Sequence, residues 1–123
     1  MFLFSRTANL RGDERHAMTW AAEMTAHVDA HSDHDVTCWR ASFGHPVGTV
    51  SWTCWSESQT ALEAGFAGLA TDDGYFEKVA AAGDMIASPP EDRLRRLLHG
   101  ERASTPPPLG AVSTVTTAIM ANG

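Results

Sequence analysis

The stretch from Thr37 to Trp55, TCWRASFGHPVGTVSWTCW, constrains the fold of this chain more than any other. β-Branched and aromatic residues dominate positions 35–43 and again 49–56, which indicates two strands. The segment between them, GHPVG, begins and ends with glycine, and this composition is typical of a tight turn. Strands joined by so short a loop pair in antiparallel fashion, so the sequence predicts a central hairpin.

Centring this hairpin on Pro46 predicts its register by placing three pairs of residues opposite each other: Cys38 with Cys54, Arg40 with Trp52, and Ser42 with Val50. Side chains alternate along a strand, so these pairs share one face, and the other face carries the aromatic side chains Trp39, Phe43 and Trp55. Cross-strand geometry suits disulfides poorly. We therefore expect the two cysteines to be small buried thiols.

The segments around the hairpin predict the rest of the fold. Residues 2–10 alternate like a strand, and a helix is predicted over about 13–31, capped by Asp13. Its apolar stripe consists of Ala17, Trp20, Ala21, Met24 and Val28. After the hairpin we expect helices over about 57–70 and 72–86. The first is opened by a capping box from Ser56 to Gln59, and Thr71, Asp72 and Asp73 give the cap signal of the second.

The C-terminal part is predicted from caps and prolines. Ser88, Pro89 and Glu91 are typical of a helix start, with Gly100 as its stop and an inner face formed by Leu94, Leu97 and Leu98. A proline-rich connector follows over 101–110, and a last strand is expected over 111–120. The length of 123 residues suits one domain spanning 1–123.

This order predicts an α+β fold of the ferredoxin-like βαββαβ type, a four-stranded antiparallel sheet with helices on one face. Either set of hairpin side chains is too apolar to leave the opposite face of the sheet exposed to water. We therefore expect a second sheet to pack against that face, as in a dimeric α+β barrel.

Charge and motifs exclude several classes of function. The formal charge is -6, whereas nucleic-acid binding needs a basic face. No apolar run reaches the roughly 18 residues of a membrane span, and no signal-peptide core is present, so we expect a cytoplasmic protein without membrane contact. Phosphate-binding loops and dinucleotide motifs are missing from the sequence, so we expect no cofactor.

In the order of its elements, essentially the whole chain resembles the dimeric α+β barrel superfamily, which includes NIPSNAP-like proteins, antibiotic-biosynthesis monooxygenases and stress-responsive barrel proteins. The segments GHPVGTVSW and ATDDGYFEKV contribute to the resemblance. The chain is also similar to the N-terminal half of actinobacterial tandem-barrel proteins, through its FLFSR strand and its DRLRRLLHG segment. The resemblance implies that a homodimer partner, or a tandem second barrel domain beyond residue 123, supplies the second sheet.

Members of that superfamily include cofactor-free oxygenases, haem degraders, cyclases, isomerases and binding proteins, so the site must be argued from residues. Arg40 either anchors an anionic ligand or is a structural arginine at the sheet edge. His45 in the turn is either an acid–base group or an exposed histidine, and His16 is a second acid–base candidate. The residues expected to line a ligand cavity are Trp20, Trp39, Trp52, Trp55, Cys38 and Cys54.

His27 and His31 share one helix face at i and i+4, a spacing that can hold a metal ion, although an exposed helix end rich in histidine needs none. Three functions therefore remain open. The first is binding of a small apolar or aromatic compound, with oxygenation, cyclisation or isomerisation of an aromatic or polyketide-like substrate. The second is a non-catalytic structural module that only seals an interface. The third is a haem- or metal-binding barrel that uses these two histidines.

Overall fold

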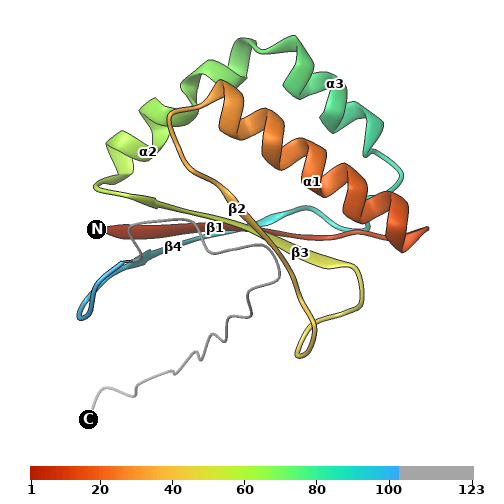
Figure 1. Ribbon diagram of the computed structural model, residues 1–123, viewed down its shortest axis with the longest axis horizontal. Coiled ribbons are helices and arrows are strands. Elements are labelled where there is room, and N and C mark those ends of the chain that lie inside the picture. Colours follow the sequence, from red (N-terminus) through yellow and green to blue (C-terminus); the bar gives the residue numbers. More distant parts are fainter. Residues whose placement is uncertain (103–123) are drawn as a thin grey trace.

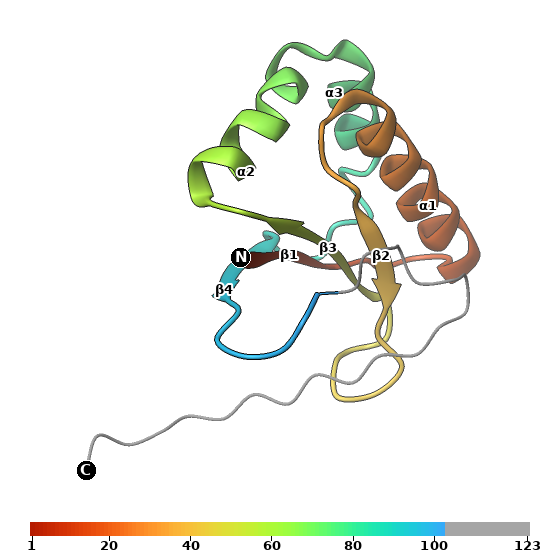
Figure 2. The same cartoon turned by 60° about the vertical axis from the view of Figure 1, so that its left-hand side comes forward.

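The computed structural model describes residues 1–102. Its strands are β1 (Phe2–Asn9), β2 (Thr37–Arg40), β3 (Thr49–Ser56) and β4 (Glu91–Arg96). Its helices are α1 (Glu14–His31), α2 (Gln59–Phe66), the 3₁₀ helix η1 (Ala67–Thr71) and α3 (Asp73–Ala81). The strands form one antiparallel sheet in the order β2-β3-β1-β4, and the helices cover one face of it (Figures 1 and 2). The predicted ferredoxin-like α+β fold is confirmed.

The longest helix, α1, forms as the sequence predicts. The Asp13 side chain caps it by accepting a hydrogen bond from the backbone N–H of His16 at 2.9 Å. Its buried residues are Ala17, Trp20, Ala21 and Met24, the central part of the predicted apolar stripe. They pack on Ala8, Leu10 and Val50 of the sheet layer, which places the core between α1 and the middle of the sheet.

β1 is a central strand and forms the floor under the helices. It pairs with β3 on one side and β4 on the other, so Arg6 lies opposite both Trp52 and Asp92. Alternation along the strand turns Phe4, Arg6 and Ala8 toward the helix layer. The same alternation turns Leu3 and Ser5 to the opposite face of the sheet.

The hairpin forms, but its predicted register is wrong by two residues. Cys38 lies opposite Trp52, and Arg40 lies opposite Val50. The register differs because β2 ends at Arg40 and the backbone N–H of Ala41 donates to the Thr49 carbonyl at 2.9 Å. A shift of two residues keeps every side chain on its predicted face, because the side-chain period of a strand is also two. Phe43, expected within the strand, is in the loop and 94% exposed.

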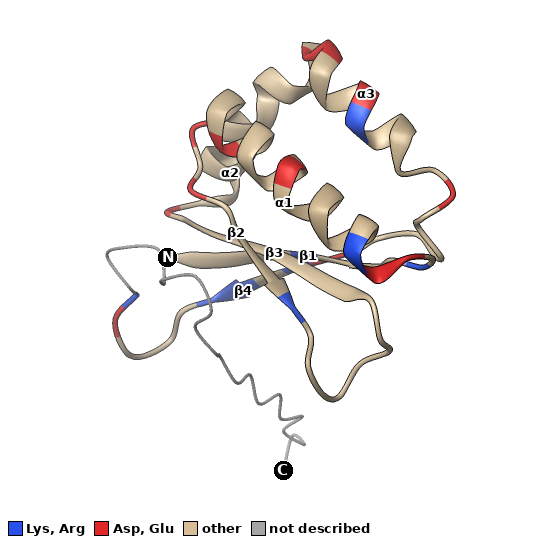
Figure 3. Cartoon of the chain, turned by 45° about the vertical axis from the view of Figure 1, so that its right-hand side comes forward, with Lys and Arg blue, Asp and Glu red and all other residues tan. Residues whose placement is uncertain are grey.

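The predicted helix from Ser88 to Gly100 is wrong, because residues 91–96 form strand β4 instead. β1 would otherwise leave one edge of hydrogen-bonding groups unpaired, and this segment pairs with that edge. β4 is itself an edge strand and carries Arg93, Arg95 and Arg96, which suits its solvent-facing position (Figure 3).

The two helices after the hairpin are confirmed, with shorter bounds than predicted and η1 between them. The first cap differs from the prediction: Ser58 rather than Ser56 accepts from the backbone N–H of Ala61 at 3.0 Å. Ser56 instead donates to the Ser58 carbonyl at 2.9 Å. The second cap, Asp72, accepts from the backbone N–H of Tyr75 at 3.1 Å, as the sequence indicates.

The predicted strand over 111–120 lies outside the described residues, as does the predicted connector from residue 103 onward. Between residues 1 and 102, no helix has both the length and the apolar character required to cross a bilayer.

Candidate functional site

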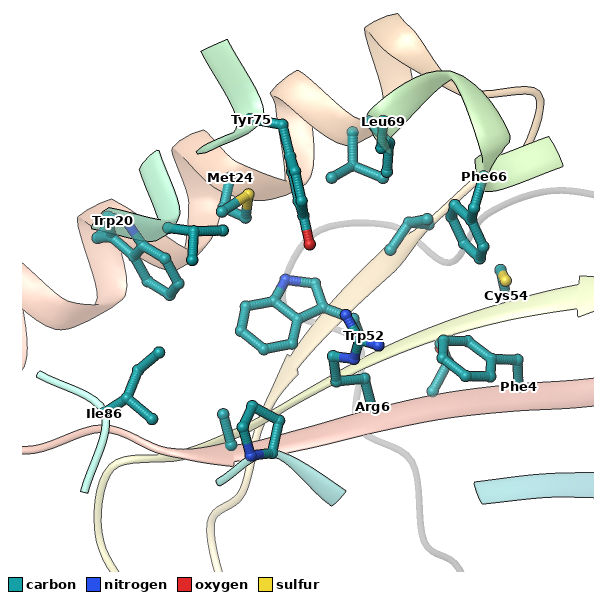
Figure 4. A pocket seen from close by; sticks show the side chains of 16 residues that line it. Phe4, Arg6, Trp20, Met24, Trp52, Cys54, Phe66, Leu69, Tyr75 and Ile86 are labelled. Atoms are coloured by element: carbon teal, nitrogen blue, oxygen red, sulfur yellow. The ribbon is translucent and has the colours of Figure 1, made fainter. Parts of the chain in front are cut away.

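A pocket of about 360 Å³ lies between the sheet and the helices (Figure 4). It is on the helix-covered face of the sheet, not on the opposite face where the sequence predicts a second sheet. Its lining comes from every layer of the fold: Phe4, Arg6, Ala8, Trp20, Met24, Val28, Val36, Trp52, Thr53, Cys54, Phe66, Leu69, Tyr75, Val79, Ile86 and Pro90. Most of these side chains are apolar or aromatic, which is usual for a small-molecule site.

Two tryptophans form one wall of the pocket. The rings of Trp20 and Trp52 meet edge to face, with centroids 6.1 Å apart and planes at 86°. The Trp20 indole N–H donates to the Lys78 carbonyl at 2.9 Å, and that of Trp52 donates to the Thr25 hydroxyl at 2.9 Å. Because both indole N–H groups are already bonded, this wall presents ring carbon to a ligand and is held rigidly.

The other end of the pocket is formed by Phe4, Phe66 and Cys54. The two phenyl rings are tilted, with centroids 5.9 Å apart. Cys54 is 3% exposed and a free thiol. Burial raises its pKa to about 11, so the thiol is uncharged at neutral pH and contributes apolar surface rather than a nucleophile.

Among the described residues that line this pocket, Arg6 is the only charged one. Its guanidinium binds the Asp92 carboxylate through two hydrogen bonds, Nε to Oδ1 at 2.8 Å and Nη2 to Oδ2 at 2.9 Å. The pKa of Arg6 is raised, chiefly by the hydrogen bond to Asp92 and in smaller part by the Tyr75 hydroxyl, while burial opposes the rise. Nη1 is not used by Asp92 and remains available to donate.

The Tyr75 side chain reaches down from α3 into the pocket, with its hydroxyl toward Trp52 and Arg6 (Figure 4). A phenol hydroxyl can both accept and donate, so Tyr75 adds a second polar group to the pocket near Arg6. Arg6 and Tyr75 therefore form a polar region between the tryptophan wall and the end formed by Phe4, Phe66 and Cys54. Guanidinium and phenol donors in one pocket can bind a carbonyl, hydroxyl or enolate oxygen.

Three of the predicted ligand-lining residues are in the pocket, namely Trp20, Trp52 and Cys54. Trp39 and Trp55 are on the opposite face of the sheet, where the Trp39 indole donates to the Thr53 hydroxyl at 2.9 Å. Cys38 packs against the core on the helix side without lining the pocket.

The three predicted catalytic residues are not brought together. His45 is exposed in the hairpin loop, and His16 is exposed in the first turns of α1. Arg40 forms an ion pair with Glu14 at 3.0 Å, where both side chains are more than half exposed. Their catalytic roles therefore receive no support from this placement.

Sequence reasoning missed Arg6, Tyr75 and Asp92. Arg6 carried a signal, because it is the one charge on the apolar side of the alternating strand FLFSRTAN. Asp92 carried none, because the segment around it reads as a helix and its partner is 86 positions away.

His27 and His31 lie in the last turns of α1, outside the pocket. Their rings stack with centroids 4.0 Å apart, and both side chains approach the carboxylate of Asp72. The structure thus places the carboxylate of Asp72, a group that can also bind a metal ion, beside the predicted histidine pair.

Comparison with known proteins bears on the fold. Neither protein-family models nor curated protein sequences give a match. Among solved structures, a NIPSNAP domain protein from Burkholderia xenovorans superposes with a TM-score of 0.66 at 13% identity, over 79% of this chain and 94% of that one. A variant of SnoaB, a cofactor-independent oxygenase from Streptomyces nogalater, superposes with a TM-score of 0.58 at 13% identity, over 80% of this chain and 94% of that one.

An antibiotic biosynthesis monooxygenase superposes with a TM-score of 0.61 at 7% identity, over 80% of this chain and all of that one. At sequence identities this low, the superpositions establish a shared fold and nothing about function. At that level the resemblance inferred from the sequence is confirmed: the chain has the ferredoxin-like fold of NIPSNAP domains and antibiotic biosynthesis monooxygenases.

Proposed function

We propose that the protein binds a flat, mainly apolar small molecule with an oxygen-bearing edge, in the pocket between the sheet and the helices. The observation that carries the proposal is the pocket's combination of aromatic walls with one polar region. Trp20 and Trp52 offer ring faces and edges, while Arg6 and Tyr75 offer donors. Aromatic and polyketide-like compounds that bear a carbonyl or phenolic oxygen match both features.

The chemistry that this pocket favours is proton transfer at the oxygen-bearing edge of the ligand. The ligand would lose its proton to water, and Arg6 and Tyr75 would donate hydrogen bonds that stabilise the oxyanion left behind. Oxygenation, cyclisation and isomerisation of such compounds can all begin from an enolate or phenolate. The similarity in fold to a cofactor-independent oxygenase supports this class of reaction.

We also propose that a second sheet covers the face that carries Trp39 and Trp55, from a second copy of the chain or from a tandem domain. No helix or strand within residues 1–102 covers that face (Figure 1). Two indole rings and Leu3 give it an apolar character that packing against another sheet would bury.

The first experiment uses two fluorescent probes of similar shape, the anionic anilinonaphthalene sulfonate and the neutral phenylnaphthylamine. Both should quench tryptophan fluorescence in the wild-type chain, because two tryptophans line the pocket. Arg6→Met should weaken binding of the sulfonate about tenfold or more, the usual value of a hydrogen bond to a charged group, and leave the neutral probe unaffected.

Arg40→Met is the matched control, because Arg40 also forms a surface ion pair but outside the pocket. It should leave both affinities unchanged. If neither probe quenches the wild-type protein, the binding function is refuted, and the structural module becomes the better account. Equal loss in both arginine variants would refute the role of Arg6.

A further inference from the structure

A second cluster of reactive side chains lies outside the pocket, where the end of α1 meets the start of α3. We call it the His27–His31–Asp72 cluster. The Nε2 atom of His27 lies 3.2 Å from both carboxylate oxygens of Asp72, and that of His31 lies 3.9 Å from Oδ2. All three ligand atoms fall within 4.8 Å of one another. Ligand atoms around a tetrahedral zinc are about 3.3 Å apart, so a small rotation of His31 suffices.

The hydrogen bonds orient the free nitrogen of His31 toward the cluster. The Nδ1 atom of His31 lies 2.8 Å from the His27 carbonyl oxygen. A carbonyl can only accept, so Nδ1 carries the hydrogen in the neutral ring and Nε2 holds the lone pair. Metal-binding histidines in proteins commonly use this arrangement, in which one ring nitrogen donates to a backbone carbonyl and the other binds the ion.

The carboxylate of Asp72 is held in place by the fold. It caps α3 by accepting from the backbone N–H of Tyr75, and this bond, followed by the contact with His27, keeps its pKa below the ordinary value. The side chains of His27 and Asp72 are 15% and 14% exposed, whereas His31 is 49% exposed. The cluster therefore has two side chains held in place and one that can adjust from the solvent side. In the metal-free chain Nε2 of His27 donates to the carboxylate, and this hydrogen would leave, or move to Nδ1, when an ion binds.

Gly74 makes the close approach of His27 possible. A Cβ atom at that position would lie 2.7 Å from Cε1 of His27 and 3.2 Å from Oδ1 of Asp72. Any larger residue would push the imidazole ring away from the carboxylate.

We propose that the His27–His31–Asp72 cluster binds a divalent transition-metal ion of the zinc type. Two imidazole nitrogens and one carboxylate suit Zn²⁺ or Co²⁺ and do not suit Mg²⁺ or Ca²⁺, which prefer oxygen ligands. Three protein ligands leave one position of a tetrahedral ion open to water. The ion would fasten α1 to the start of α3, the helix that carries Tyr75 into the pocket.

The test uses the full chain without an affinity tag, dialysed against a chelator and titrated with Co²⁺ and Zn²⁺. Co²⁺ should produce the visible absorption bands of a tetrahedral site, saturating at about one ion per chain, and Zn²⁺ should displace it. Zn²⁺ should also raise the melting temperature by about 5 °C or more, because it binds only the folded state, whereas Mg²⁺ should have no effect.

The variants Asp72→Asn and His31→Gln should each weaken Zn²⁺ binding by at least about tenfold, since even the outer shell of a metal site is worth that much. Asparagine also caps helices well, so Asp72→Asn keeps the fold. His16→Gln, on the exposed first part of the same helix, is the matched control and should bind normally. Absence of Co²⁺ bands, or binding unchanged in Asp72→Asn, would overturn the proposal.

Discussion

A larger side chain on α1 that reaches into the pocket tests most directly whether the pocket is empty in the folded chain. Val28 lines the pocket and is only partly buried, so its side chain can be extended into the cavity. The substitution Val28→Phe places a phenyl ring there. A cavity of about 150 Å³ is enough to hold benzene, and this pocket of about 360 Å³ is larger.

The expected magnitude follows from the added apolar surface. Phenylalanine has about four more carbon atoms than valine, and a buried CH₂ is worth about 0.8 kcal/mol, which sets a ceiling of about 3 kcal/mol. Partial burial and the loss of side-chain entropy reduce the gain to about 1–2 kcal/mol. If packed side chains already filled the space, the same change would instead cost about 1–3 kcal/mol through overpacking. The two cases therefore differ in sign.

Urea denaturation measures the free energy of unfolding, and the two fluorescent probes measure binding. We expect Val28→Phe to raise the urea midpoint at an unchanged slope and to weaken both probes. Ala26→Phe, on the exposed side of the same helix, is the control and should change the unfolding free energy by no more than about 0.5 kcal/mol. A lower midpoint for Val28→Phe would refute the argument that the pocket is open in the native fold.

Three further predictions concern Cys54 and the open face of the sheet, the face that carries Trp39 and Trp55. Burial raises the pKa of Cys54 from an ordinary value of 9.0 to about 11. At pH 8 its thiolate fraction and alkylation rate should therefore be about 100-fold below those of the urea-unfolded chain. Equal alkylation rates in the folded and unfolded chains would contradict this. The unfolded chain loses this proton first, so stability should fall as pH rises from 9.0 toward 11, and Cys54→Ala should flatten that slope. If a second copy covers the open face, the wild-type chain should sediment at twice 13.2 kDa and Trp55→Glu at 13.2 kDa; a wild-type monomer would exclude the homodimer.

Much of the fold could be predicted because its signals are local. The alternation in β1, the apolar stripe of α1 and the caps at Asp13 and Asp72 each involve residues a few positions apart. Side-chain faces were also predicted correctly, because a register error of two residues does not change which face a residue is on. For that reason Trp52 and Cys54 were correctly predicted to share one face of the sheet, although the residues predicted opposite them on β2 were wrong.

The candidate site was less predictable because its polar groups meet across long sequence distances. Arg6 finds Asp92 only after β4 pairs with β1, and His27 finds Asp72 only after α3 packs beside α1. The histidine pair itself was visible as an i, i+4 spacing. Its carboxylate was visible only as a helix cap.

The sequence by itself determined the central hairpin, the long amphipathic helix and the α+β order of elements, since hydrophobic periodicity and capping act within a few residues. Only the tertiary structure decided that residues 91–96 form a strand, although SPPEDRLRR has the composition of a helix start. Local preference there amounts to a few tenths of a kcal/mol per residue. Pairing with β1 adds a ladder of backbone hydrogen bonds, each worth about 0.5–1.5 kcal/mol, and together they outweigh the local preference. The same pairing brings Asp92 to Arg6 and completes the polar region of the pocket.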